Sequence, residues 1–123
     1  MQAAAATHEI VLEFGIEQET IDLWAELSED HNPLHVDPAY AATSRFGSTI
    51  AHGQLALAFV TELLGRELGE EWCRHGALRN VRFRAPLRPR RRYRLTAHPR
   101  GERWHFELRD RDSNRLCVEG WVD

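Results

Sequence analysis

The stretch that decides the fold is Gly53–Leu68, with the sequence GQLALAFVTELLGREL. Within it, residues 55–60 are apolar on every side of a helix. A helix without a polar face is normally buried all round, and this one is shorter than the about 20 residues that cross a bilayer. The stretch therefore predicts a central core helix against which the rest of the chain packs.

Downstream of this helix, apolar residues alternate with polar ones instead of recurring at helical spacing. Four such runs follow Gly76, at residues 81–85, 93–97, 104–108 and 116–122. Alternation with a period of two is typical of half-buried strands. The polar turn at residues 112–114 predicts that the last two strands pair antiparallel.

Upstream of the helix, the chain predicts one more strand and two shorter helices. Residues 8–14, HEIVLEF, favour a half-buried strand, and residues 18–27 have helical spacing. Pro33 disfavours helix in the residue before it, and Asp37 ahead of Pro38 is typical of a helix cap. The order is α+β, which predicts a single hot-dog domain over residues 1–123, with an antiparallel sheet wrapped around the buried helix.

The amino-acid composition of the chain excludes several classes of function. The chain has 123 residues, of which 28% are charged and 42% hydrophobic, as in one folded domain. All 16 basic residues are arginine, which excludes a lysine Schiff base or a lysine phosphate loop. Cys73 and Cys117 are far apart, and no signal peptide or membrane-spanning run is present. We therefore expect a cytoplasmic protein with reduced thiols that does not enter a membrane.

Charge is spread unevenly along the chain. Residues 1–76 carry a net charge of −10 and residues 77–123 carry +7, for a total of −3. Nonspecific nucleic-acid binding usually brings a basic total, so no nucleic-acid partner is expected. The arginine-rich strands are either a solvated sheet face or a surface that meets CoA phosphates or an acidic carrier protein.

Residues that carry chemistry gather just before the core helix. Asp30 and His35 flank Pro33, and a kinked loop can aim a carboxylate and an imidazole into one pocket as an acid–base pair. The alternative is an ion pair that braces the loop. Gly53 begins the core helix, where a free N–H, no Cβ and the helix dipole make an oxyanion site. No GxSxG motif or nearby cysteine supplies a nucleophile, so the set suits proton transfer beside a thioester carbonyl.

Neighbouring residues have plainer interpretations. His31 and His35 have the spacing of a metal pair on a helix, but Pro33 interrupts that helix and HExxH is absent, so neither a metal nor a cofactor is expected. Asp37 is interpreted as a helix cap. His52 either takes part in catalysis or makes a local hydrogen bond that sets the turn before the core helix.

Four segments carry a family resemblance. SEDHNPLHVD at 28–37, FG at 46–47, IAHG at 50–53 and VRFRAPL at 81–87 resemble the MaoC-like, or R-specific enoyl-CoA hydratase 2, family of hot-dog proteins. The resemblance implies that Asp30 and His35 hold a water as a catalytic dyad and that Gly53 supplies the oxyanion N–H. It implies a substrate-binding role for Asn32, which would brace the loop, for His52 and for Thr61, which falls near the thioester.

The resemblance also implies an activity and partners. The expected enzyme is a cofactor-independent hydro-lyase that adds water to 2-enoyl thioesters to give (R)-3-hydroxyacyl thioesters, or reverses this. Its substrate would be an acyl-CoA or acyl-carrier-protein thioester, bound along the interface of a homodimer. The alternatives are a hot-dog thioesterase, with Asp30 activating water against the carbonyl, and a binding subunit without turnover. His31 replaces a more usual aromatic residue, and PLRPRRRYRL lacks a Gly-Asp common in the family.

Overall fold

A computed structural model describes residues 9–123, so the predicted start of the first strand at His8 lies outside the described residues. Its strands form one antiparallel sheet in the order β1-β3-β4-β5-β2. Their bounds are β1 Ile10–Ile16, β2 Leu78–Phe83, β3 Arg91–Arg100, β4 Arg103–Asp110 and β5 Leu116–Val122. The predicted antiparallel pairing of the last two strands is confirmed.

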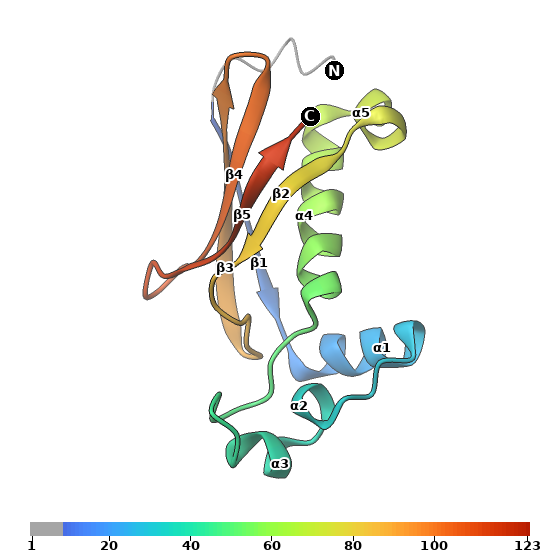
Figure 1. The fold of residues 1–123 in the computed structure, drawn as a ribbon, viewed down its shortest axis with the longest axis vertical. Coiled ribbons are helices and arrows are strands. Elements are labelled where there is room, and N and C mark those ends of the chain that lie inside the picture. The colour runs from blue at the N-terminus through green and yellow to red at the C-terminus, as the bar shows by residue number, and fades with distance from the viewer. Residues whose placement is uncertain (1–8) are drawn as a thin grey trace.

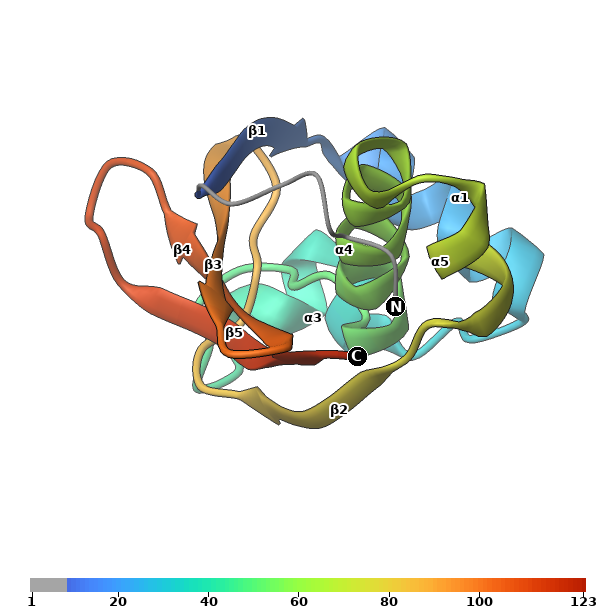
Figure 2. The same ribbon diagram turned by 90° about the horizontal axis from the view of Figure 1, so that it is seen from above.

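Helices lie along the concave side of this sheet and at its ends. Their bounds are α1 Gln18–Ser28, α2 Pro33–Val36, α3 Pro38–Ala42, α4 Gly53–Leu68 and α5 Glu70–His75. The sheet curves around α4, while α1, α2 and α3 gather near the N-terminal end of α4 (Figures 1 and 2). This is the predicted hot-dog arrangement. No helix in residues 9–123 is both long enough and apolar enough to cross a membrane.

The core forms between α4 and the alternating side chains of the strands. Inward-facing residues of β3 and β4 are buried, as the period of two predicts: Tyr93, Leu95, Ala97, Trp104, Phe106 and Leu108. They face a buried stripe on the helix made of Leu55, Ala56, Val60, Leu64 and Leu68. The helix is not buried all round, however, because Thr61 and Glu62 are exposed and Leu57 and Phe59 are only half-buried. The sheet covers one face of α4 and leaves the opposite face open.

Strand β2 contains a bulge that the sequence pattern did not predict. Its pairing with β5 shifts register between Arg79 and Arg82, and Asn80 has a positive φ of 54°. An extra residue in one strand reverses which side chains face the core beyond it. Beyond the bulge Phe83 still points inward as predicted, since it pairs with the buried Val118 and its ring lies against Gly53; it is 54% exposed because β2 is at the edge of the sheet.

The chain between α1 and α4 is more regular than its proline content suggests. Pro33 occupies the first turn of α2 instead of preventing a helix, and the Asn32 side chain caps that helix by accepting the Leu34 N–H at 3.0 Å. Asp37 caps α3, as predicted, by accepting the Tyr40 N–H at 3.1 Å. The chain around Pro33 is therefore the start of a short capped helix and not a kinked loop.

Candidate functional site

The predicted acid–base residues converge at the N-terminal end of α4. Asp30 lies in the link between α1 and α2, His35 lies in α2, and Gly53 is the first residue of α4. Two backbone bonds hold these pieces together: the Ile50 N–H donates to the Leu34 carbonyl at 3.1 Å, and the Ala51 N–H donates to the Leu87 carbonyl at 2.7 Å. The start of α4 is thereby fixed against both α2 and the segment that follows β2.

Asp30 and His35 face each other without touching. Asp30 Oδ2 lies 4.0 Å from His35 Nε2, and the two side chains are 53% and 13% exposed. This distance is too long for a direct hydrogen bond, which rarely exceeds about 3.2 Å. One water molecule between the two atoms can bond to both. The geometry therefore suits a shared water better than a tight ion pair.

The hydrogen-bond partner of Nδ1 determines which ring nitrogen of neutral His35 carries the hydrogen. His35 Nδ1 lies 2.8 Å from the Ile50 carbonyl oxygen, which can only accept, so Nδ1 carries the hydrogen in the neutral ring. The lone pair is then on Nε2, the atom that faces Asp30. The Gln18 side chain adds a further restraint by donating from Nε2 to the His35 carbonyl at 2.8 Å.

His52 contacts both members of the pair. It is 4% exposed, its Nε2–H donates to the Asp30 carbonyl oxygen at 3.0 Å, and its ring stacks on His35 with a centroid distance of 3.8 Å. The prediction of a purely local hydrogen bond is wrong, because this bond spans 22 residues of sequence. Through it, one buried ring restrains the backbone of Asp30 and the imidazole of His35 together.

Gly53 offers its N–H to the same place. Within residues 9–123 no acceptor bonds to this amide, as expected for the first residue of a helix. A Cβ at this position would lie 3.3 Å from the ring of Phe83, closer than almost all Cβ contacts. Glycine thus keeps the amide open between α4 and the edge strand.

Two pockets meet at His35, His52 and Gly53. The first has a volume of about 400 Å³ and a mostly apolar wall, to which Ile50, Ala51, Ala56, Phe83 and Leu87 contribute. The second has a volume of about 300 Å³ and includes Asp30, Trp24, Ser28 and Gln54. Among the residues that the structure describes, Trp24 Nε1 and His52 Nδ1 are buried and have no hydrogen-bond partner. Buried polar atoms are rarely left unpaired, so these two indicate a place for a water or a ligand atom.

The remaining predicted residues are placed differently. Asn32 caps α2 and lines neither of these two pockets, and its backbone N–H donates to Asp30 Oδ1 at 3.3 Å. Thr61 is exposed on α4 and lines neither the first nor the second pocket. His31 is exposed, and the structure does not bring it to His35.

Sequence reasoning missed three residues that support the site, namely Gln18, Thr49 and Trp24. Thr49 is buried, and its hydroxyl donates to Gln18 Oε1 at 2.5 Å, which orients the Gln18 amide toward His35. The two residues are 31 positions apart and belong to no short motif. Trp24 was interpretable only as core packing, because its helical spacing says nothing of the pocket that it lines.

Asp30, His35 and His52 are the described residues that come nearest to a metal site. Their ligand atoms all lie within 4.8 Å of one another, and Asp30 Oδ2 lies 4.0 Å from His35 Nε2, against about 3.4 Å between two ligands of a tetrahedral zinc ion with bonds of about 2.1 Å. His52 Nε2 is already bonded to the Asp30 carbonyl. The arrangement therefore fits a bridging water better than an ion, and no step below uses a metal.

Comparison with known proteins identifies the family and the fold of this chain. The MaoC like domain family matches residues 2–118. The chain is 53% identical over 45 residues to the (R)-specific enoyl-CoA hydratase of Aeromonas caviae, covering 37% of this chain and 34% of that protein. It is 39% identical over 85 residues to the 3-hydroxyacyl-thioester dehydratase Z of Mycobacterium tuberculosis, covering 67% of this chain and 56% of that protein.

The fold is shared with a solved hydratase over its whole length. The structure of the (R)-hydratase from A. caviae involved in PHA biosynthesis matches with a TM-score of 0.79 and 25% identity, over 100% of this chain and 98% of that chain. The sequence matches to the two curated relatives span only about a third to a half of their lengths. The chain belongs to the MaoC-like domain family and has its hot-dog fold.

Proposed function

We propose that this chain is a cofactor-independent hydro-lyase that interconverts 2-enoyl and (R)-3-hydroxyacyl thioesters. The observation that carries the proposal is the 4.0 Å gap between Asp30 Oδ2 and His35 Nε2, set beside the unbonded N–H of Gly53. A water in that gap and a thioester oxygen on that N–H place the two reactants of a hydration next to each other. The names of the two curated relatives support the same reaction class.

The reaction balances with these groups alone. The Nε2 lone pair of His35 accepts a proton as the water oxygen, oriented by Asp30, bonds to C3 of the enoyl group. The C2–C3 double-bond electrons move toward the thioester oxygen, where the Gly53 N–H and the positive end of α4 stabilise the enolate. C2 then takes a proton from the Asp30–His35 pair. The product carries the hydroxyl on C3 and the hydrogen on C2, and dehydration is the reverse.

Crotonyl-CoA tests this proposal directly. The purified chain is mixed with crotonyl-CoA while the conjugated enoyl absorbance and the release of free thiol are followed together. We expect absorbance loss without thiol. Thiol release would instead identify a thioesterase, in which water attacks the carbonyl carbon, and neither signal over a range of acyl lengths would leave a binding subunit as the better description.

The proposal extends to the oligomeric state of the protein and to the cellular compartment in which it acts. We expect a homodimer, because β2 is an edge strand that exposes Phe83 beside Gly53, and a second copy would cover this part of the first pocket. We also expect the chain to form one domain and to act in the cytoplasm on an acyl-CoA or carrier-protein thioester.

A further inference from the structure

A third pocket shares a wall with the first. It has a volume of about 190 Å³ and is lined in part by Ala85 and Pro86, which also line the first pocket. The segment that carries these two residues is firmly held, because the Arg84 and Ala85 N–H groups both donate to the Cys117 carbonyl, at 2.7 and 3.2 Å. One short, fixed piece of chain therefore separates the two pockets.

The third pocket is lined by Arg88, Arg91 and Arg115, and we call it the arginine pocket. Of these three, and within the part of the chain that the structure describes, Arg91 alone has a carboxylate within reach, with its Nη1 3.4 Å from Asp110 Oδ2. Arg88 donates to two neutral acceptors at 2.6 Å, the Phe46 carbonyl and the Ser48 hydroxyl. Within residues 9–123 no acidic side chain pairs with Arg88 or Arg115, so two positive charges remain unbalanced.

In contrast, most arginines on the outer face of the sheet form an ion pair with a carboxylate. Each of five outer arginines lies within ion-pair distance of a Glu or Asp side chain: Arg79, Arg84, Arg94, Arg103 and Arg109. Asp110, the acid of the arginine pocket, is also occupied by the N–H groups of Asp112 and Ser113, at 2.9 and 3.1 Å. Arg82, Arg92 and Arg100 also make no ion pair within residues 9–123, so the pocket is distinguished by three guanidinium groups that line one cavity.

The other ionisable groups of the arginine pocket do not supply negative charge. Burial raises the pKa of Tyr93 to about 12 and raises the pKa of the Cys117 thiol. Both side chains are therefore neutral at pH 7, and the walls carry only the Asp110 charge against three guanidinium groups. A pocket with this balance favours an anion, and guanidinium groups match a phosphate in particular because they donate two parallel hydrogen bonds.

We propose that the arginine pocket binds the phosphate group that ends a phosphopantetheine arm, which CoA thioesters and carrier-protein thioesters share. The identity of the arm rests on the proposed function. With the thioester oxygen on Gly53 and C3 beside Asp30, the sulfur side of the substrate lies toward the first pocket, whose wall continues through Ala85 and Pro86 to the arginines. The pocket is several times larger than the about 30 Å³ that one water occupies, which leaves room for a phosphate group.

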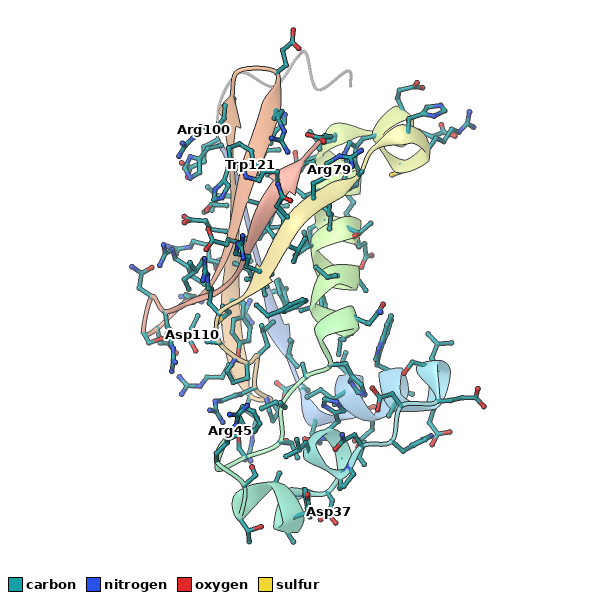
Figure 3. The ribbon with its side chains drawn as sticks, viewed as in Figure 1. Asp37, Arg45, Arg79, Arg100, Asp110 and Trp121 are labelled. Carbon is teal, nitrogen blue, oxygen red and sulfur yellow. The ribbon has the colours of Figure 1, made fainter. Side chains whose placement is uncertain are left out.

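Binding measurements with Arg115→Glu test the site without relying on turnover. Arg115 is exposed and makes no ion pair within residues 9–123, so its replacement removes no internal contact of its side chain. The matched control is Arg100→Glu, which makes the same charge change at the tip of the β3–β4 hairpin, far from the pocket (Figure 3). Titration calorimetry then compares CoA, 4′-phosphopantetheine and pantetheine on each variant and on the unaltered chain.

We expect Arg115→Glu to weaken CoA and 4′-phosphopantetheine by about tenfold or more, because a charge-assisted contact is lost and a repulsion is gained. Pantetheine, which lacks the phosphate, should bind equally to all three proteins. Equal weakening of pantetheine, unchanged binding of 4′-phosphopantetheine, or the same effect from Arg100→Glu would each overturn the proposal.

Kinetics separate this proposal from the proposed function and distinguish the two sources of the arm. With crotonyl-CoA, Arg115→Glu should raise KM about tenfold and leave kcat unchanged, while crotonyl-pantetheine should show neither change. A matching rise in KM with a crotonyl carrier protein identifies the shared phosphate, and a rise with CoA alone would overturn that assignment. If the unaltered chain hydrates neither thioester, the proposed function fails, while the binding results still decide the phosphate site.

Discussion

His52 is the side chain on which the geometry of the whole site depends most. It bonds to the carbonyl of Asp30, stacks on the ring of His35 and directly precedes Gly53 in the chain. Its Nε2 must carry the hydrogen, because the Asp30 carbonyl can only accept. We infer that it positions the reacting groups from behind and does not exchange protons with the substrate.

Replacing His52 with Gln or with Asn distinguishes a positioning role from a requirement for the imidazole ring itself. The amide nitrogen of Gln can occupy roughly the place of His Nε2, while the shorter Asn side chain reaches only as far as Nδ1. We therefore expect His52→Gln to keep most of the hydration rate and His52→Asn to lower kcat about tenfold or more with little change in KM. Steady-state kinetics with crotonyl-CoA measure both parameters, and equal loss in the two variants would contradict the inference.

The acid–base pair should show a much larger effect on rate. Asp30→Asn and His35→Ala should each lower hydration by at least about 100-fold, because each removes a group that orients or deprotonates the shared water. Circular dichroism and thermal unfolding check that both variants stay folded. Near-normal rates in both would show that Asp30 and His35 only brace the loop.

The sequence predicted which residues come together at the candidate site better than how they are held in place. Asp30, His35 and Gly53 lie within one short motif around a proline and a helix start, where local chemistry restricts the options. The long bond from His52 to Asp30 and the support from Gln18 and Thr49 could not be predicted, because they depend on how α1 packs beside α2. Such contacts join positions that local spacing leaves independent.

At the scale of the elements, one carboxylate joins three strands of the sheet. Asp123, directly after β5, pairs with Arg79 of β2 and with Arg103 of β4, whose Nε lies 2.6 Å from Asp123 Oδ1. Arg103 also lies over the ring of Trp121, 4.6 Å from its centroid. Arg79 and Trp121 sit side by side on neighbouring strands at this end of the sheet (Figure 3). The contacts of Asp123 therefore restrain an edge strand that has only one neighbour.

These contacts make the stability contributed by Asp123 depend on pH. The hydrogen bond from Arg103, followed by that from Arg79, lowers the pKa of the Asp123 carboxyl below its ordinary value of 3.8. A carboxyl whose pKa is lower in the folded state stabilises the fold above its unfolded pKa, and the contribution is lost as the pH falls through the folded pKa. We expect Asp123→Asn to cost about 1 kcal/mol or less near neutral pH, because the pair is partly exposed.

Thermal unfolding at two pH values checks this sign. The Tm of Asp123→Asn should fall a few degrees below that of the unaltered chain near neutral pH, and the difference should vanish by about pH 2. Asp112→Asn is the control, since Asp112 is exposed in the β4–β5 turn and its side chain makes no ion pair within residues 9–123. A Tm difference that stayed constant with pH would contradict the charge argument.

The helices and strands of the structure can be compared with those that the sequence predicts. Periodicity predicted α4, α1 and the strands β3, β4 and β5, because each buries one face against a continuous core. It also predicted the inward-facing Val81 and Phe83 of β2, but it did not predict the bulge near Asn80, which brings Leu78 to the same face, and it missed α5. A bulge changes which residues are buried without changing the letters of the sequence, so alternation alone cannot reveal it.

Across the whole molecule, the two edges of the sheet carry similar exposed apolar side chains. Val11 on β1 is 51% exposed and Phe83 on β2 is 54% exposed. Only Phe83 also lines the first pocket and lies against Gly53. The proposed homodimer should therefore form through β2, where a second copy would close the pocket as well as the edge.

Matched charge substitutions on the two edges test this assembly. Phe83→Glu should shift the chain from dimer toward monomer, because a carboxylate would have to lose its water in a covered interface. Val11→Glu, a substitution of similar exposure on the opposite edge, should leave the assembly unchanged. Light scattering coupled to size-exclusion chromatography measures both masses, and dissociation by Val11→Glu alone would place the interface on β1.

The direction of α4 also separates the two ends of the protein. The helix starts at the pockets and runs to α5, where the Trp72 Nε1–H donates to the Asp123 carbonyl at 2.9 Å (Figure 1). A fluorescent reporter or a tether to a solid support, joined by a flexible linker after Asp123, would emerge at the end remote from Gly53. The protein could then be immobilised with its pocket mouths facing the solution.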